Sequence, residues 1–395
     1  MPPASTPSST PPRPPREVAT MAELRAILAS GRSLAGLRLE SLDLDEVEDQ
    51  LIGRPDVRGL IVLGGHVSSR LGDQLRDRGA ILFPAPGDAP VPIFRSGLYT
   101  PQELYASLEK GYDQTPDARA YRWSRQERHT DDVYSTLRRA IHDDQIGDAL
   151  TDVLAGRVVS GVMGGHAVTR GSPAFADAAR LGHRLAQAGH IVLTGGGPGA
   201  MEGANLGAFA ADIASLEEAL SSLSEVPGYA GAIERWASAA LTVRAQLVAE
   251  REPGGPPRSI GIPTWFYGHE PPNVFVDHVA KYFSNALRED RIISRCTGGI
   301  VVLPGAAGTV QEVFQAITAL YYSDPDQALP PLVLVDRRHW TRQIPVWDVV
   351  TALAAGRPMA HAVHLVEHVD EAAEVLIRSG SRSGRGELAA SSVDL

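Results

Sequence analysis

Two glycine-rich stretches in this sequence have the residue types and spacing of loops that bind a phosphate. TGGGPGAMEGAN (194–205) and PGAAGTVQE (304–312) each follow a short apolar run and lead into a stretch with helical periodicity. Glycine lets backbone amides approach an anion closely, and the N-terminus of a following helix points unpaired N–H groups at the same place. Neither stretch has the GKS or GKT ending of a P-loop, or the pattern GxGxxG. A mononucleotide is therefore favoured over a dinucleotide.

Glu312, at the end of the second stretch, has two interpretations that the residues alone leave open. Thr309 and Glu312 have the spacing of a capping box, in which the glutamate bonds back to the first amide of a helix. The same carboxylate would also lie within a side chain's reach of whatever the glycines hold. It is therefore a candidate for acid–base chemistry on that ligand.

The elements that must position these loops form an alternating pattern. Short apolar runs alternate with longer stretches of helical spacing, and the runs are continuous rather than alternately polar: 157–165, 190–197, 258–266, 298–305, 331–336 and 363–369. Such runs predict an α/β fold, a Rossmann-like doubly wound parallel sheet with helices on both faces. Ligands of these sheets bind at the carboxyl ends of the strands, where both glycine stretches fall.

The composition divides the chain into a catalytic domain and flanking regions. We expect a Rossmann-like nucleotide-binding catalytic domain over 126–378, with a helical insertion at about 211–257, and a smaller N-terminal α/β region over 17–125. The Pro/Ser/Thr-rich segment 1–16 and the Gly/Ser/Arg-rich segment 379–395 are predicted to be disordered tails.

Bulk properties exclude several classes of function. The formal net charge is −10, from 37 basic and 47 acidic residues, which argues against a nucleic-acid-binding surface. No apolar run approaches ~20 residues and no secretory signal is present, so no membrane contact and a cytoplasmic location are expected. The single cysteine, Cys296, excludes an internal disulfide and a multi-cysteine zinc site. No cluster of His, Asp and Glu predicts a metal, and no cofactor is implied.

The two glycine-rich stretches resemble the paired motifs GGGxxGxM and PGGxGTxxE of the LOG-like family, whose members are often mislabelled lysine decarboxylases. The resemblance covers roughly 155–340, and the extra N-terminal sequence is similar to that of the longer bacterial nucleotide 5′-monophosphate nucleosidases. It implies a phosphoribohydrolase that hydrolyses the N-glycosidic bond of a nucleoside 5′-monophosphate to free base and ribose 5-phosphate. Such relatives form homodimers or higher homo-oligomers.

The resemblance also implies which residues act. Glu312 would stabilise the oxocarbenium-like charge, bind ribose hydroxyls and orient or deprotonate the attacking water. The arginine maps to Arg288, with Arg291 as the alternative, on a helix expected over 273–296. Two positions depart from the family pattern, Glu289 for lysine and Ala306 for glycine. The predicted substrate-binding residues are Gly164, Gly165, Gly195, Gly196, Gly197, Gly199, Met201, Glu202, Gly305, Ala306, Gly308 and Thr309.

Other interpretations remain open from the sequence. The arginines 288, 291 and 295 also fit a solvated helix face. His166 and Arg170 could face the ligand or serve only a turn, and the aromatic run 265–267 could stack on a base or pack an interface. The rival function is a non-catalytic nucleotide-binding sensor or cofactor carrier of the same fold. Lysine decarboxylation would need a Schiff-base lysine, and neither Lys110 nor Lys281 is suitably placed.

Overall fold

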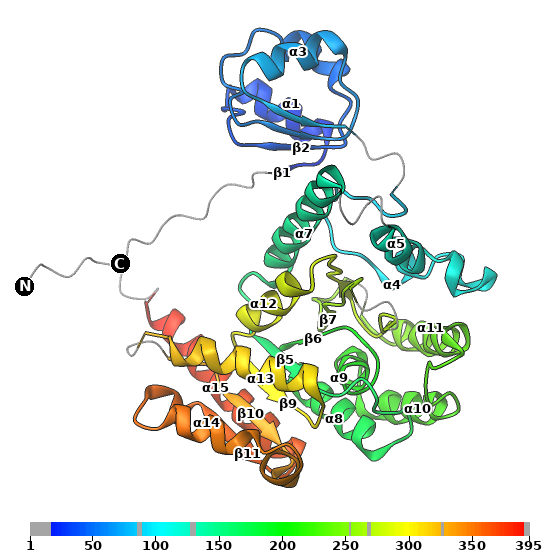
Figure 1. Cartoon of the computed structure of the whole chain (residues 1–395), viewed down its shortest axis with the longest axis vertical. Helices are drawn as coiled ribbons and strands as arrows, with labels where there is room; N and C mark the ends of the chain where they lie inside the picture. The colour runs from blue at the N-terminus through cyan, green and yellow to red at the C-terminus, as the bar shows by residue number, and fades with distance from the viewer. Residues whose placement is uncertain are drawn as a thin grey trace, which may run out of the picture. The chain divides into compact units, whose positions relative to one another are not determined.

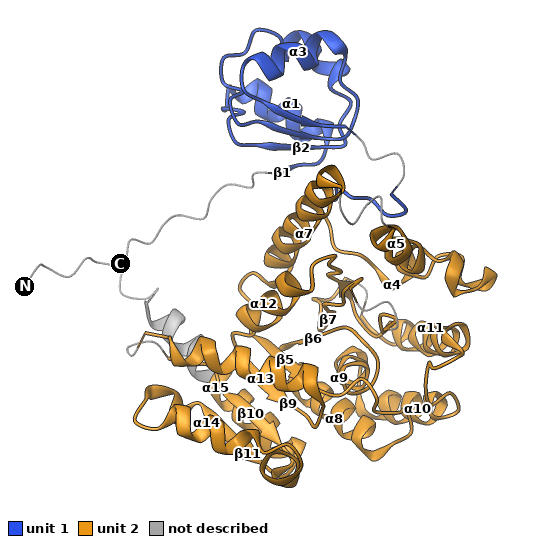
Figure 2. Ribbon diagram, viewed as in Figure 1, with its two compact units in different colours: residues 1–96 blue, residues 97–395 orange. Residues whose placement is uncertain are grey.

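The computed structural model describes residues 17–84, 89–126, 132–252, 254–266, 270–324 and 328–390. The chain divides into two compact units, residues 1–96 and 97–395, which are coloured separately in Figure 2. Each unit has its own parallel sheet.

The first unit is a small α/β unit built on four parallel strands in the order β1-β2-β3-β4. Buried leucines such as Leu24, Leu39 and Leu71 fill the space between sheet and helices. The strands and α-helices are β1 (Glu17–Val18), α1 (Met21–Ser30), β2 (Arg38–Glu40), α2 (Glu48–Leu51), β3 (Ile61–Leu63), α3 (Ser69–Asp77) and β4 (Ile81–Phe83). The predicted N-terminal α/β region is confirmed.

The second unit contains a parallel sheet of seven strands in the order β11-β10-β9-β5-β6-β7-β8 (Figure 1). The strands are β5 (Val159–Met163), β6 (Ile191–Thr194), β7 (Ser259–Gly261), β8 (His278–Val279), β9 (Gly299–Val302), β10 (Leu332–Val335) and β11 (Val363–Val366). The chain runs outward from β5 to β8, then returns to the other side of β5 as β9. This reversal is the topological switch point of a doubly wound sheet, where ligands bind.

Helices cover both faces of this sheet, so the predicted doubly wound α/β fold is confirmed. Buried side chains of α8, α9 and α15 form one core cluster with the central strands. The helices of the unit are α4 (Pro101–Leu104), α5 (Pro116–Arg125), α7 (Val133–Leu154), α8 (Pro173–Gln187), α9 (Ala200–Phe209), α10 (Ile213–Ser224), α11 (Ile233–Ala249), α12 (Asn285–Arg295), α13 (Ala307–Tyr321), α14 (Val346–Ala354) and α15 (Val369–Ala390).

Two glycines let α8 and α9 approach each other closely. A Cβ on Gly207 would lie 1.7 Å from the carbonyl oxygen of Ala179, and one on Gly182 would lie 2.0 Å from that of Ala204. Any larger side chain would separate the helices, because both obstacles are backbone atoms. The close packing fixes α9, and α9 begins where the first glycine loop ends.

The segment 97–125 belongs to the second unit, whereas the sequence grouped it with the N-terminal region. The reason is a set of polar contacts that composition does not reveal. Asp117 of α5 accepts hydrogen bonds from Trp265 Nε1 at 2.8 Å and from Lys281. The hydroxyl of Tyr105 donates to the carbonyl of Pro272 at 2.6 Å.

One predicted helix boundary is wrong. The helix expected over 273–296 begins only at Asn285, with Ser284 as its N-cap, and the residues before it include β8. Val274, Phe275 and Val276 are consecutive and all buried, which suits extended chain in a core and not one face of a helix. At the other end of the chain, α15 continues to Ala390, within the segment 379–395 for which the sequence predicts a disordered tail. Residues 1–16 and 391–395 lie outside the described residues.

Candidate active site

Three loops meet at the carboxyl ends of neighbouring strands β9, β5 and β6. The middle loop contains Gly165, whose amide donates to the carbonyl of Pro304 in the second glycine stretch at 3.1 Å. The carbonyl of Gly165 in turn accepts from the amide of Ala200, in the first glycine stretch, at 3.1 Å. The two predicted phosphate loops are therefore held together through the loop that separates them.

Several positions in these loops accept glycine alone. Gly199 has φ of +74°, and a Cβ there would lie 2.5 Å from the carbonyl oxygen of Gly165. A Cβ on Gly164 would lie 2.9 Å from the Cβ of Ala200. Gly196 has φ of +69°, in the left-handed region that glycine favours. The glycines therefore serve close backbone approach and a left-handed turn.

The second loop leads into α13, whose N-terminus no described side chain caps. The first amides of such a helix have no intrahelical partner and favour an anion. The hydroxyl oxygen of Thr309 lies over the loop, only 2.1 Å from where a Cβ on Gly305 would stand. Ala306, which stands where the family pattern has glycine, has φ −111° and ψ −148°; its φ is negative, so the position does not require the left-handed freedom of glycine.

Arg288 connects the first glycine loop to Glu312. Its Nη2 donates to the carbonyl of Gly195 at 3.2 Å and its Nε donates to the carbonyl of Ile262 at 2.8 Å. Its Nη1 lies 3.9 Å from Glu312 Oε1. Arg288 is 8% exposed. The backbone carbonyls of two loops hold its charged guanidinium in place.

Glu312 is not part of a capping box. The N-cap of α13 is Ala306, so Thr309 and Glu312 both lie inside the helix. The Glu312 side chain is 13% exposed, and burial raises its pKa to about 7. The charge of Arg288 lowers this pKa, while the charges of Glu289 and Glu270 raise it. Near neutral pH the carboxyl can therefore accept or donate a proton.

The other two arginines of α12 face α7 instead of the loops. The guanidinium of Arg291 faces Gly147 of α7, with Nε 3.4 Å from where a Cβ on that glycine would stand. Arg295 donates to Thr151 Oγ1 at 2.6 Å. Of the three candidates, Arg288 is the one that the fold brings to Glu312.

Some predicted site residues are packed inside the protein. Glu202 is 1% exposed, and its carboxylate accepts hydrogen bonds from Arg170, with Arg170 Nε at 3.0 Å. The Arg170 guanidinium also stacks over Trp236, 4.4 Å from its ring centroid. Met201 is buried with its sulfur against Gly195. These residues support the loops from inside the protein, and the carboxylate of Glu202 is engaged by Arg170.

The aromatic run after β7 is split between core and surface. Trp265 is 2% exposed and bonded to Asp117, so packing is the role that the structure gives it. Phe266 is half exposed. Tyr267 lies outside the described residues. Elsewhere in this unit, the single cysteine, Cys296, is buried.

Three residues at the site were missed by sequence reasoning. Asn273 donates to the carbonyl of Gly197 at 3.0 Å, Glu270 Oε1 lies 3.4 Å from His166 Nδ1, and His339 contacts the carbonyl of Gly305 at 3.1 Å. The segment EPPN (270–273), in which two polar residues flank two prolines, could have indicated Glu270 and Asn273. It follows a strand of the sheet, and such loops carry binding residues.

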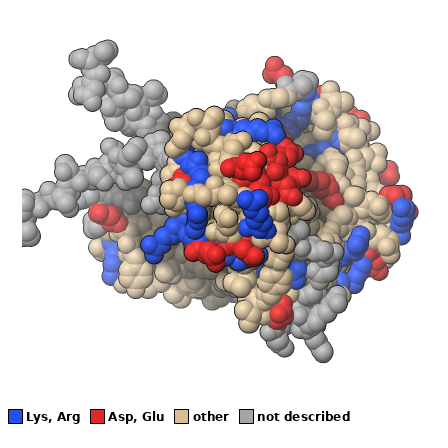
Figure 3. All heavy atoms as spheres, turned by 90° about the horizontal axis from the view of Figure 1, so that it is seen from above, with Lys and Arg blue, Asp and Glu red and all other residues tan. Residues whose placement is uncertain are grey.

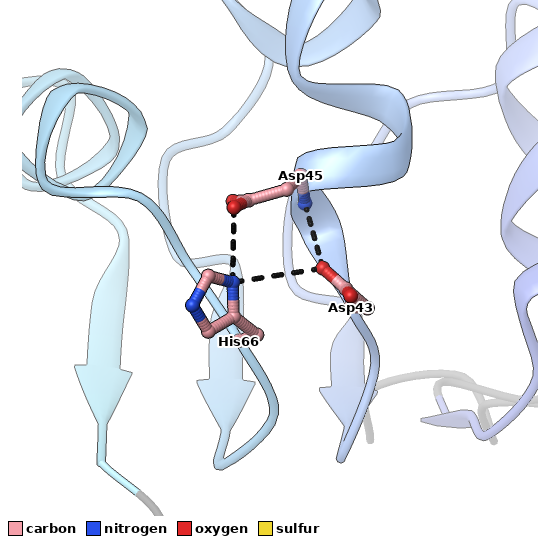
Figure 4. Close-up of side chains that lie close together, drawn as sticks. All are labelled: Asp43, Asp45 and His66. Carbon is pink, nitrogen blue, oxygen red and sulfur yellow. Dashed lines mark hydrogen bonds and ion pairs between the residues drawn. The ribbon is translucent and has the colours of Figure 1, made fainter.

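Within the described residues, one group has three possible metal-binding side chains, and it lies in the first unit. Figure 4 shows His66 between Asp43 and Asp45, with Nδ1 at 3.7 and 2.9 Å from their carboxylates. All three are exposed and lie after β2 and β3.

No described helix is long and apolar enough to cross a membrane. On the face drawn in Figure 3, basic side chains are interspersed with acidic ones and form no continuous basic surface.

Comparisons with known proteins identify related sequences and structures. Residues 242–378 match the family described as possible lysine decarboxylase, and residues 157–216 match the SLOG cluster4 family. A search of curated proteins found no match. The molybdenum cofactor binding protein of Rippkaea orientalis is 18% identical, covering 56% of this chain and 96% of that one, with a TM-score of 0.33. The Moco carrier protein of Chlamydomonas reinhardtii is 21% identical, covering 57% and 99%, with a TM-score of 0.34.

Proposed function

We propose that this chain, which its two family matches place in the LOG-like family, hydrolyses the N-glycosidic bond of a nucleoside 5′-monophosphate. Water adds its oxygen to C1′, and the base leaves with a proton. The products are free base and ribose 5-phosphate. The rest of the reaction is derived from the side chains and loops of the site.

The second glycine loop, which leads into α13, supplies the binding of the phosphate. The uncapped N-terminus of α13 offers amides to an anion, and the Thr309 hydroxyl lies beside Gly305 in the loop before it. Binding energy from the phosphate then positions the sugar, which does not itself react at that end. This arrangement favours 5′-monophosphates over free nucleosides.

Glu312 and Arg288 supply the chemistry at C1′. The transition state carries positive charge on the sugar, as in glycoside hydrolysis, and a carboxylate stabilises it. The same carboxylate orients the attacking water and removes its proton, a role suited to a pKa of about 7. Arg288 fixes Glu312 by charge and neutralises negative charge on the substrate.

The observation that carries the proposal is the position of the pair Arg288–Glu312. The guanidinium bonds to the first glycine loop while lying 3.9 Å from a carboxylate on the helix that follows the second loop. Because a carboxylate beside an anion site repels the anion, phosphate binding alone does not account for Glu312, whereas chemistry at C1′ does.

The test is incubation of the full chain with a panel of purine and pyrimidine nucleoside 5′-monophosphates, followed by chromatography of the products. We expect free base and ribose 5-phosphate in equal amounts from at least one nucleotide, and none from the matching nucleosides. Nucleotide binding without release of base would contradict the proposal and support the sensor or carrier function.

A further inference from the structure

A third carboxylate, Glu270, lies at the rim of the site and is not used in the proposed hydrolysis. Its Oε2 is 3.7 Å from where a Cβ on Gly197 would stand, so the carboxylate lies over the first glycine loop. Its Oε1 is 3.4 Å from Nδ1 of His166, which lies in the middle loop. The side chain is 24% exposed and therefore accessible to a ligand.

The backbone that carries Glu270 is fixed to the first glycine loop. The amide of Asn273 donates to the carbonyl of Gly196 at 2.8 Å, and its side-chain amide donates to that of Gly197 at 3.0 Å. Asn273 is 1% exposed, so these bonds are shielded from water. Two prolines between Glu270 and Asn273 restrict the backbone further. The carboxylate therefore has a defined position relative to the loop.

The charge of Glu270 determines which part of a ligand it can face. Glu270 lies close enough to Glu312 for its charge to help raise the pKa of Glu312. A phosphate beside Glu270 would be repelled, whereas O–H groups are donors that carboxylate oxygens accept. A vicinal diol offers two such donors to the two oxygens of one carboxylate.

We propose that Glu270 is a specificity residue that accepts hydrogen bonds from the 2′- and 3′-hydroxyls of the bound ribose, with His166 holding its carboxylate in place. The inference rests on the proposed function and adds selectivity for ribonucleotides over 2′-deoxyribonucleotides.

The test is calorimetric titration of the full chain with ribose 5-phosphate and with 2-deoxyribose 5-phosphate, which needs no turnover. We expect the wild type to bind ribose 5-phosphate at least ~10-fold more tightly, the usual value of a hydrogen bond to a charged group. Glu270→Gln should reduce the difference to within ~3-fold, mainly by weakening ribose 5-phosphate binding. Glu218→Gln, an exposed carboxylate on α10, is the matched control and should behave as the wild type.

A second arm compares kcat/KM for a ribonucleotide and its 2′-deoxy analogue in the same proteins. Equal binding of both sugars by the wild type, or selectivity that Glu270→Gln leaves unchanged, overturns the inference even if base is released. Selectivity in binding that is lost in Glu270→Gln supports the inference even if no base is released, in which case the proposed function alone fails. If Glu270→Gln does not fold, Glu270→Asp, which withdraws the carboxylate by one methylene, carries the same expectation.

Discussion

At the scale of single residues, burial sets the acid–base behaviour of Glu312. Its pKa is raised to about 7, chiefly by desolvation. Because the ionised form is the one that stabilises positive charge and removes a proton from water, kcat/KM should fall about tenfold per pH unit below about 7 and be constant above it. A pH–rate profile checks this. A rate independent of pH between 5 and 8 would contradict the role of Glu312.

The same raised pKa affects stability with a defined sign. Between about 4.5 and about 7 the folded state holds a proton on Glu312 that the unfolded chain releases. The contribution of this proton to the free energy of unfolding is therefore fully present below that pH range. It is lost as the pH rises through the range, which lowers the free energy of unfolding by up to about 3 kcal/mol. Urea denaturation of the wild type and Glu312→Gln at pH 5 and pH 8 should show the wild type losing more stability with pH.

Glu289 provides a separate test of this electrostatic account. It accepts hydrogen bonds from Asn285 Nδ2 at 2.8 Å and Gln311 Nε2 at 2.6 Å, and its charge helps to raise the pKa of Glu312. Glu289→Gln should therefore move the acidic limb of the pH–rate profile to lower pH, while Glu218→Gln should leave it in place. A limb that stays fixed in Glu289→Gln would show that this charge does not reach Glu312.

The motifs located Glu312 and Arg288, and the structure then decided what the sequence could not. The capping-box interpretation failed because it depends on where α13 begins, and the helix begins at Ala307, before Thr309. Glu270 was missed because its proximity to Gly197 comes from the fold of a loop and not from spacing.

At the scale of elements, α12 must be held so that Arg288 reaches both the first loop and Glu312. Asp143 of α7 does this from outside the helix, accepting from the amides of Phe283 and Ser284 at 2.9 and 2.8 Å. Asp143 is 2% exposed. Its charge also complements the positive end of the helix dipole.

Asp143→Asn should therefore destabilise the protein, because the amide group has one acceptor oxygen and leaves a buried N–H without a partner. We expect a loss of about 1–3 kcal/mol in the free energy of unfolding and a lower kcat/KM. Urea denaturation and steady-state kinetics measure the two effects. An unchanged midpoint with unchanged kinetics would show that α12 is positioned by other contacts.

The strand pattern predicted six strands of the larger sheet, and β5, β6, β7, β9, β10 and β11 confirm it. The strand pattern did not predict β8, which has only two residues. The charged residues around β8, taken together with those of α12, fit the spacing of one long helix. A pairing with β7 decides the conformation there, and pairing is not a property of the local sequence.

At the scale of the whole molecule, the second unit contains every residue proposed to act. The loops, Arg288, Glu312 and Glu270 all lie between residues 97 and 395, as do the core clusters that support them. Tyr99 pairs with Val279 near the start of this unit, its amide donating to the Val279 carbonyl at 2.9 Å.

A fragment covering 97–395 should therefore unfold cooperatively and release base within ~3-fold of the rate of the full chain, since a domain with its own core can fold alone. Circular dichroism and the nucleotide assay check this. A folded fragment that has lost activity would place a functional group in the first unit.

The most direct measurement of the central claim compares nucleotide binding and base release in the wild type and in Glu312→Gln, with Glu218→Gln as the control. The amide keeps the size of the carboxyl group but carries no charge and removes no proton. We predict nucleotide affinity within ~10-fold of the wild type and base release lower by at least ~100-fold, the usual contribution of general acid–base catalysis. Base release at the wild-type rate in Glu312→Gln would contradict the account.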